Sequence, residues 1–183
     1  MTEHLALDVI SGDRLGERDR AALLGLCSRA YETDFEPLFQ TFAGATHVLA
    51  RQHGAVVSHA LWVTRWLQAG DGPLLRTAYV EAVATEPAYQ RRGLATAVMR
   101  RLAEAIADQS IRCDFDLGAL SPSDDGFYVR LGWETWRGPL SIRTATGSMP
   151  TPEDRVMILC LPGTPDLDLD APLSAEWRDG ELW

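Results

Sequence analysis

The feature that most constrains the fold of this chain is a long apolar strand pattern that runs into a helix through an arginine-rich turn. Residues 74–85 (LLRTAYVEAVAT) read as a strand, which Pro87 ends because proline cannot extend a β-ladder. Apolar residues return at helical spacing between 93 and 108, at Leu94, Val98, Leu102, Ala105 and Ile106. The pattern predicts a strand–turn–helix unit with Gly93 in the first turn of the helix.

Strand and helix patterns alternate along the rest of the chain. We expect strands over 5–10, 46–52, 55–67, 112–120, 133–136 and 155–161. We expect a helix after Asp13, its cap, with Leu23, Cys27, Ala30 and Tyr31 on one apolar face. Two shorter helical pieces are expected, over 35–42 and, behind an N-cap at Ser123, over 123–131. The tail from Pro162 is expected to wrap the surface, and the early hairpin makes the sheet mixed, within a single α/β domain.

The charge balance excludes some partners. The 183 residues carry 26 acidic and 17 basic side chains, a net charge of −9, and residues 153–183 contribute −6 of it through eight acids and two arginines. Such a chain is a poor candidate for nucleic-acid binding, which needs a basic face, and a better one for a cationic ligand. The alternative is an acidic surface that only keeps the protein soluble.

The cysteines and histidines do not suggest a metal or disulfide site. Cys27, Cys113 and Cys160 lack CxxC spacing, and the four histidines lack ligand spacing such as HExxH. No apolar run reaches the roughly 20 residues of a membrane span, and no signal-peptide pattern opens the sequence. We therefore expect a reduced, cytoplasmic protein with no metal and no membrane partner.

The turn before the helix has the properties of a phosphate site. A helix N-terminus exposes unsatisfied N–H groups and the positive end of the helix dipole. Gly93 removes a Cβ that would block a pyrophosphate, and Arg91 and Arg92 add positive charge. The turn matches neither GxGxxG nor the P-loop. The alternative is an ordinary helix start with two solvent-exposed arginines.

The hexapeptide Gln90-Arg91-Arg92-Gly93-Leu94-Ala95 resembles the Q/R-x-x-G-x-G/A signature of the Gcn5-related N-acetyltransferases (GNAT). The resemblance implies that these backbone amides hold the pyrophosphate of acetyl-coenzyme A (acetyl-CoA) and that Val83, Ala84 and Thr85 pair with its pantetheine arm. It also implies a mixed, mostly antiparallel central sheet flanked by helices on both faces, and a thiolate-protonating tyrosine at Tyr128. A homodimer is common in this superfamily.

A narrower resemblance, to the aminoglycoside 2′-N-acetyltransferases, covers most of the chain. It rests on residues 79–84, 117–121 and 151–154, on Tyr128 with Gly132-Trp133, and on the terminal WRDGELW. It implies an aminoglycoside site made of Asp34, Glu81, Ala82, Ser121, Glu153, Asp154, Glu181 and Trp183. Segment 162–183 would close that site. Two features depart from the family pattern, namely Glu181 in place of Asp and a segment from Ser121 to Tyr128 about two residues shorter.

Acetyl transfer to an amine needs a base, a donor to the carbonyl oxygen and tolerance of the departing thiolate. Glu81, in an apolar strand, is the candidate base, directly or through one water. The alternative for Glu81 is a solvent-exposed position on the strand with no catalytic role. Tyr128 is the candidate acid, and the alternative is that its ring only packs against the sheet. The Val83 N–H is the candidate donor. An acetyl-enzyme on Cys113 is the competing route, and we favour direct transfer over it.

The sequence therefore predicts an acetyl-CoA-dependent N-acetyltransferase that acts on the 2′-amine of aminoglycosides by direct transfer in a ternary complex. Two alternatives stay open. The enzyme acts on another small amine or a peptide N-terminus, or the chain is a catalytically silent acyl-CoA sensor.

Overall fold

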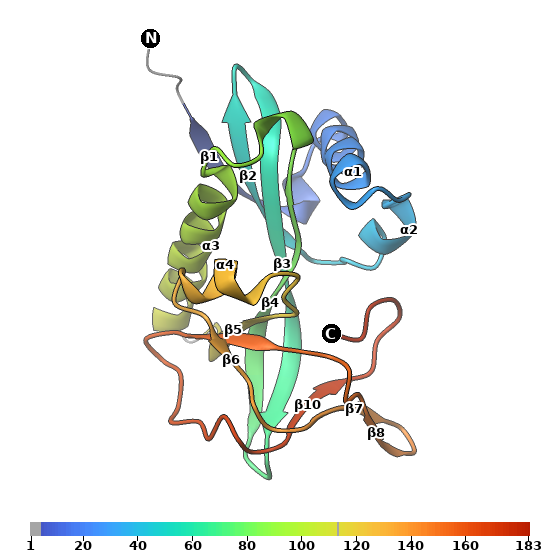
Figure 1. Cartoon of the computed structure of the whole chain (residues 1–183), viewed down its shortest axis with the longest axis vertical. Helices are drawn as coiled ribbons and strands as arrows, with labels where there is room; N and C mark the ends of the chain where they lie inside the picture. Colours follow the sequence, from blue (N-terminus) through green and yellow to red (C-terminus); the bar gives the residue numbers. More distant parts are fainter. Residues whose placement is uncertain (1–4, 113) are drawn as a thin grey trace. The chain divides into compact units, whose positions relative to one another are not determined.

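The computed structural model describes residues 5–112 and 114–183 (Figure 1). Contacts divide the chain into two compact units, one made of residues up to 63 with 80–105, the other of 64–79 with 106–183. Two long strands, β3 (Ala55–Ala69) and β4 (Leu74–Thr85), and helix α3 (Leu94–Ile111) contribute residues to both units.

The first unit is a sheet covered by helices. Strand β1 (Ala6–Ser11) pairs antiparallel with β2 (Thr46–Gln52), and β2 pairs antiparallel with β3. Helices α1 (Glu17–Tyr31) and α2 (Glu36–Phe39) lie on one side of these strands and α3 on the other (Figure 1). Two short 3-10 turns, η1 (Gly12–Arg14) and η2 (Pro87–Tyr89), precede α1 and α3. Leu23, Leu26, Leu49, Leu61, Val98 and Leu102 are fully buried.

The second unit has strand order β6-β9-β5-β4-β3-β10-β7-β8. Its strands are β5 (Leu117–Leu120), β6 (Glu134–Thr135), β7 (Leu140–Thr144), β8 (Gly147–Pro150), β9 (Met157–Cys160) and β10 (Leu173–Glu176). The pairs of β5 with β9, β6 with β9, β7 with β8 and β10 with β3 are antiparallel, whereas β10 and β7 are parallel. Helix α4 (Asp125–Val129) follows β5. The predicted α/β class with a mixed sheet is therefore confirmed.

Several local predictions are wrong. Asp13 does not cap α1, because it lies in η1 and the N-cap is Gly16. The N-cap of α4 is Asp124, whose carboxylate accepts the Gly126 N–H, rather than Ser123. Tyr31 is 45% exposed, because α1 ends there.

The predicted strand over 112–120 begins only at Leu117, because the Asp116 carboxylate accepts the Arg76 N–H at 2.7 Å in the connection that follows α3. Three strands were missed, namely β7, β8 and β10. Strand β10 lies in the C-terminal tail that was expected to wrap the surface, and it joins β3 to β7 inside the sheet.

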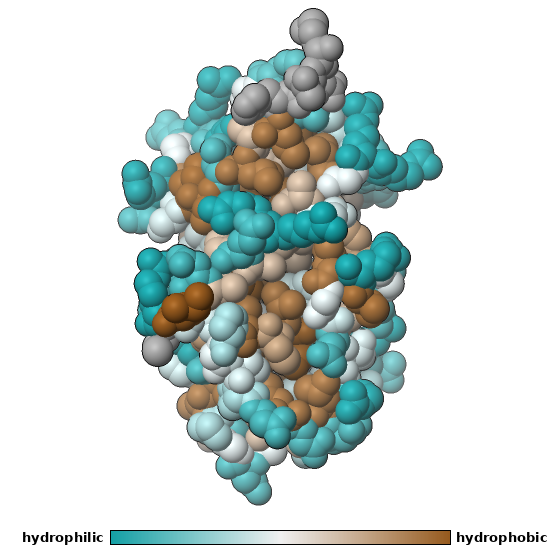
Figure 2. Space-filling view, turned by 90° about the vertical axis from the view of Figure 1, so that its left-hand side faces the viewer, coloured by the Kyte–Doolittle hydropathy of each residue, from teal (hydrophilic) through white to brown (hydrophobic). Residues whose placement is uncertain are grey.

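The surface mixes polar and apolar side chains. Figure 2 shows hydrophilic residues interspersed with apolar ones over the face that it presents. The exposed large apolar residues come from different parts of the chain, among them Ile111, Val129 and Trp177. Among the described residues, no helix is long and apolar enough to cross a membrane.

Two histidines are buried in a hydrogen-bonded pair beneath β4. His59 Nδ1 lies 3.0 Å from the Ala82 carbonyl oxygen, which only accepts, so Nδ1 carries the proton. His59 Nε2 then accepts from His47 Nδ1 at 3.0 Å. Burial lowers the pKa of His59 to about 3, and the nearby His47 adds to this shift. Burial, with the charge of Arg20, lowers the pKa of His47 to about 4.

This pair makes stability depend on pH. Below the ordinary pKa of 6.5 the unfolded chain binds protons at both imidazoles while the folded chain does not. The stabilisation is thus fully present above pH 6.5 and is lost as the pH falls, by about 2 kcal/mol per imidazole down to pH 5. In urea denaturation at pH 7.5, 6 and 5, His47→Gln should have a shallower pH dependence of unfolding free energy than the wild type.

His53→Asn is the matched control, because His53 is exposed in the β2–β3 turn at a positive φ of 51° that asparagine tolerates. It should keep the wild-type pH dependence. An unchanged slope in His47→Gln would show that the buried pair does not exclude protons in the folded chain.

Candidate functional site

Strand β4 leaves regular geometry at the segment predicted to meet the cofactor and substrate. Ala82 has a φ of 52°, the left-handed region that a residue with a Cβ adopts only when its surroundings impose it. Three consecutive carbonyls there accept hydrogen bonds from side chains: Ala82 from His59, Val83 from the Tyr31 hydroxyl at 3.0 Å, and Ala84 from Ser58 Oγ at 3.0 Å. Side chains from β3 and α1 therefore hold the backbone of β4 in this conformation.

These three side chains were missed as site residues. Tyr31 was assigned to an apolar helix face, and no local pattern marks Ser58 or His59. Their signal is polarity, since serine and histidine interrupt the otherwise apolar residues 55–63 of strand β3, where both are fully buried. Buried polar groups require partners, and that rule points to a backbone in need of hydrogen bonds.

The turn between β4 and α3 is open and positively charged. Arg91 and Gly93 have φ values of 60° and 79°, and a Cβ placed on Gly93 would meet no atom within 4 Å. Arg91 and Arg92 are exposed, the latter with its guanidinium 5.1 Å from the centre of the Tyr89 ring. The Ala97 N–H donates to the Gly93 carbonyl at 3.0 Å, so the helix starts directly after this glycine.

This geometry fits a phosphate group. The first N–H groups of α3 lack acceptors within the helix, and a bulky side chain is absent where the chain turns. Of the predicted cofactor residues, Gln90 is exposed and its amide lies 3.4 Å from the Thr85 carbonyl. Leu94 is buried and Ala95 half-buried in the first turn of α3. The turn can therefore hold an anionic diphosphate through its backbone, with the two arginines beside it.

The first unit also contains the predicted residues Glu81 and Asp34. Glu81 is half-buried on β4, directly before the left-handed Ala82. Asp34 is exposed in the loop between α1 and α2, where its carboxylate accepts the Glu36 N–H at 3.1 Å. Tyr31, which stacks on Phe35 at 5.1 Å between ring centres, connects the end of α1 to β4. The loop that carries Asp34 is thus anchored to the strand that carries Glu81.

Tyr128 lies in α4 of the second unit and is 5% exposed. Its ring meets Trp133 edge-on at 6.2 Å between centres. Burial, and to a smaller extent the charge of Asp124, raises the pKa of Tyr128 to about 12. The hydroxyl is protonated at neutral pH, as an ordinary tyrosine is, and its raised pKa makes it a weaker acid than an exposed tyrosine. This burial agrees with the packing role, and the acid role of this tyrosine stays a prediction.

The second unit brings the terminal tryptophan to the acidic turn. The Trp183 indole N–H donates to Thr151 Oγ1 at 2.8 Å, and Trp183 is 5% exposed. The same turn carries Glu153 and Asp154, both exposed, and the Asp154 N–H donates to the Thr151 carbonyl at 3.2 Å. Thr151 and Asp154 line a cavity of about 350 Å³. Three of the predicted substrate residues therefore gather at one place.

The other predicted residues of this unit are less closely connected. Ser121 is exposed immediately after β5. Glu181 is exposed, and its carbonyl accepts from Arg178 Nε. Cys113, the competing nucleophile, lies outside the described residues. Among the described residues, no group of three or more His, Cys, Asp or Glu side chains is arranged to hold a metal ion.

Comparisons with known proteins agree with this geometry. Residues 15–136 match the model of an acetyltransferase (GNAT) domain. The chain is 38% identical, over 187 aligned residues, to the aminoglycoside 2′-N-acetyltransferase of Mycolicibacterium fortuitum, covering 98% of this chain and 92% of that one.

Solved structures share the fold. The GNAT-family N-acetyltransferase YhbS from Escherichia coli in complex with CoA has a TM-score of 0.65 at 14% identity, over 98% of this chain and 92% of that one. A GCN5-related N-acetyltransferase from Kribbella flavida has a TM-score of 0.59 at 22% identity over 75% of this chain, which spans about a third (34%) of its length. With the domain match, the near full-length relative and the turn before α3, the chain belongs to the GNAT acetyltransferases.

Proposed function

We propose that this chain transfers the acetyl group of acetyl-CoA to the 2′-amine of aminoglycosides. The observation that carries the proposal is its 38% identity, over nearly the whole chain, to an enzyme named for that activity. The acidic turn beside Trp183 supports it, because an aminoglycoside is a polycation and carboxylates both attract and orient its ammonium groups.

The donor supplies a thioester that an amine can attack. The turn at Arg91, Arg92 and Gly93 binds its phosphates, which places the acyl end along β4. The backbone N–H of Val83 donates to the carbonyl oxygen as negative charge develops there. The side chains that hold β4 set the direction of this N–H.

Two side chains handle protons in the proposed reaction. Glu81 removes a proton from the amine, directly or through one water, because an ammonium has no lone pair for attack. Tyr128, whose hydroxyl is protonated at neutral pH, donates its proton to the thiolate as the carbon–sulfur bond breaks. The amine attacks the thioester directly, in a complex of enzyme and both substrates.

Substrate binding is assigned to the acidic residues and to the tail. The proposed contacts are Asp34, Glu81, Ala82, Ser121, Glu153, Asp154, Glu181 and the Trp183 end. Segment 162–183 closes the site in this proposal. The proposal also includes location in the cytoplasm, which the free thiols of Cys27 and Cys160 support.

The proposal further includes a homodimer, because homodimers are common in this superfamily.

The first test of the function is thiol release from acetyl-CoA with a panel of amines. Aminoglycosides that carry a 2′-amine should release thiol, and those with a 2′-hydroxyl should not, because the hydroxyl is the weaker nucleophile at neutral pH. A basic peptide and a simple diamine complete the panel. Release with the peptide alone would favour a protein substrate, and release with none despite CoA binding would favour the sensor.

The base is tested by Glu81→Gln, which keeps the shape of the side chain and removes its basicity. We expect kcat to fall by ~10²–10⁴-fold, with loss of the acidic limb of the pH–rate profile. Glu104→Gln, on the exposed face of α3, is the matched control and should retain wild-type turnover. A Glu81→Gln enzyme with the wild-type pH profile would exclude the base role.

The substrate carboxylates are tested by Asp34→Asn and Glu181→Gln. Each removes one charge that binds drug in the ground state as well as in the transition state, so KM for the aminoglycoside should rise with little change in kcat. Asp166→Asn, an exposed acid of the C-terminal segment, is the control. Equal effects of all three variants would indicate a general electrostatic attraction rather than specific contacts.

A further inference from the structure

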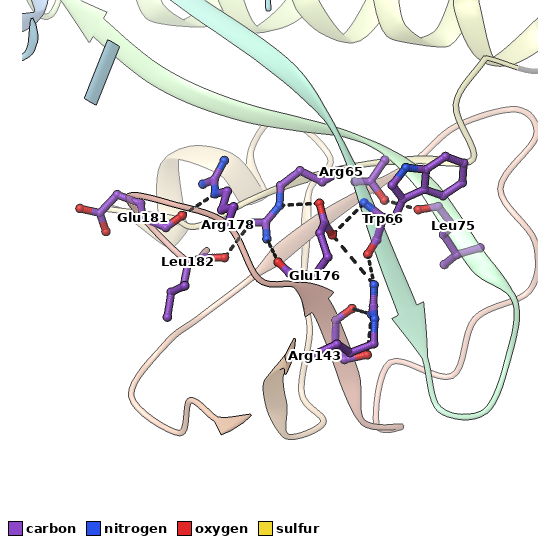
Figure 3. Close-up of polar contacts among 10 residues, drawn as sticks. Arg65, Trp66, Leu75, Arg143, Glu176, Arg178, Glu181 and Leu182 are labelled. Carbon is purple, nitrogen blue, oxygen red and sulfur yellow. Dashed lines mark hydrogen bonds and ion pairs between the residues drawn. The ribbon is translucent and has the colours of Figure 1, made fainter. Parts of the chain in front are cut away.

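Arg65 on β3 is a buried cation that the mechanism above does not use. Its side chain is 1% exposed. Nη1 donates to the Leu182 carbonyl at 2.7 Å and Nη2 to the Glu176 carbonyl at 2.8 Å, while Nε lies 3.5 Å from the Glu176 carboxylate (Figure 3). The guanidinium also lies 4.8 Å from the centre of the Tyr79 ring. These three polar contacts all lead to residues 176–182.

Stability alone does not account for a guanidinium at this position. Burying a cation carries a large desolvation cost, and well-packed apolar residues commonly replace buried ion pairs without loss of stability. An apolar side chain, however, cannot donate hydrogen bonds to two backbone carbonyls at once. The planar fork of arginine does so, whereas lysine presents a single point charge. The role of Arg65 is therefore to fix the positions of the main-chain carbonyls to which it donates.

The Glu176 carbonyl ends strand β10, whereas the Leu182 carbonyl belongs to a segment with no regular structure of its own. Residues 177–183 are all described, and none belongs to a helix or strand. Arg178 Nε donates to the Glu181 carbonyl, and its guanidinium lies 5.6 Å from the centre of the Tyr79 ring. Trp183 is bound to Thr151. Apart from the Trp177 N–H, which donates to the Arg143 carbonyl at 3.0 Å, the conformation of this tail therefore depends on side-chain contacts rather than on a backbone ladder.

The contacts of Arg65 and Arg178 with the tail, together called the clamp, leave the Glu181 side chain pointing outward. In Figure 3 the Glu181 side chain points away from Arg65 and Arg178, whereas its carbonyl faces Arg178. Two arginines thus bind the backbone of the tail and leave the Glu181 carboxylate exposed beyond them. An arginine that paired with that carboxylate would compete with a cationic ligand, and here the pairing is with main-chain oxygens instead.

We propose that Arg65 is a positioning residue that holds the tail 177–183 so that Glu181 and the Trp183 end are presented to the aminoglycoside. The inference rests on the proposed function. It adds a residue that touches no substrate but determines where the substrate contacts lie.

The test compares Arg65→Gln and Arg65→Lys with Arg112→Gln, whose arginine is exposed and pairs with Asp108 at 2.8 Å on the end of α3. We expect Arg65→Gln to raise KM for a 2′-amino aminoglycoside by about 10-fold or more, as the loss of hydrogen bonds from a charged group implies. Arg65→Lys should have a smaller effect. KM for acetyl-CoA should change by less than about 2-fold.

A merely structural role would lower the amount of folded enzyme, and hence the apparent kcat, without separating the two KM values. The second measurement is amide hydrogen exchange of the peptide that covers 177–183. It should be faster in Arg65→Gln and in Arg65→Lys, and unchanged in Arg112→Gln. Wild-type exchange in both Arg65 variants would overturn the proposal.

A truncated chain separates action through the tail from other routes. Deletion of residues 181–183 removes Glu181, the Leu182 carbonyl and Trp183, so Arg65→Gln should add less than about 2-fold to KM in that background. A full 10-fold effect there would refute the mechanism. If the wild-type enzyme acetylates no aminoglycoside, the proposed function fails. If the wild-type enzyme acetylates an aminoglycoside and Arg65→Gln keeps the wild-type KM, the proposed function stands and only the positioning role of Arg65 is refuted.

Discussion

The left-handed backbone at Ala82 is the constraint on which the rest of the first unit depends. A residue with a Cβ holds this conformation only when its neighbours impose it, and here three side chains do so through the carbonyls of Ala82, Val83 and Ala84. The buried pair of neutral histidines makes one of these bonds, from His59 to the Ala82 carbonyl. Strand β4 thereby gains a fixed irregular segment directly between Glu81 and the turn that starts α3, where regular pairing would leave no backbone group for a ligand.

Arginine serves two opposite purposes in this acidic chain. All 17 of its basic residues are arginine. Arg91 and Arg92 are exposed in an open turn, where their charge is available to an anion. Arg65 and Arg143 instead bind main-chain carbonyls with both arms of the guanidinium, Arg143 those of Ser174 and Trp66 at 2.8 and 2.5 Å. The fork geometry suits this second use, because one rigid group can join two segments.

Elements that depend on local sequence signals were predicted more accurately than elements that depend on contacts between distant segments. Strand β4 and the start of α3 were predicted within a residue, because alternation, Pro87 and the glycine turn are local signals. The start of β5 was missed because Asp114 and Asp116 alternate with apolar residues as in a strand. In the structure Asp116 instead binds the backbone of Arg76, and the strand begins at Leu117. Strands β8 and β10 were missed because neither carries an apolar alternation strong enough to mark it.

The sequence by itself determined the strand–turn–helix unit, the α/β class and the family, and it identified the acidic residues as candidate contacts. These follow from local periodicity and from motifs of a few residues. Only the tertiary structure decided that Tyr31, Ser58 and His59 hold β4, that Trp183 meets Thr151, and that Arg65 grips the tail. Arg65 and Leu182 are 117 residues apart in the chain, and contacts at such separations leave no periodic trace in the sequence. They depend on how the sheet brings distant segments together, which local propensities do not encode.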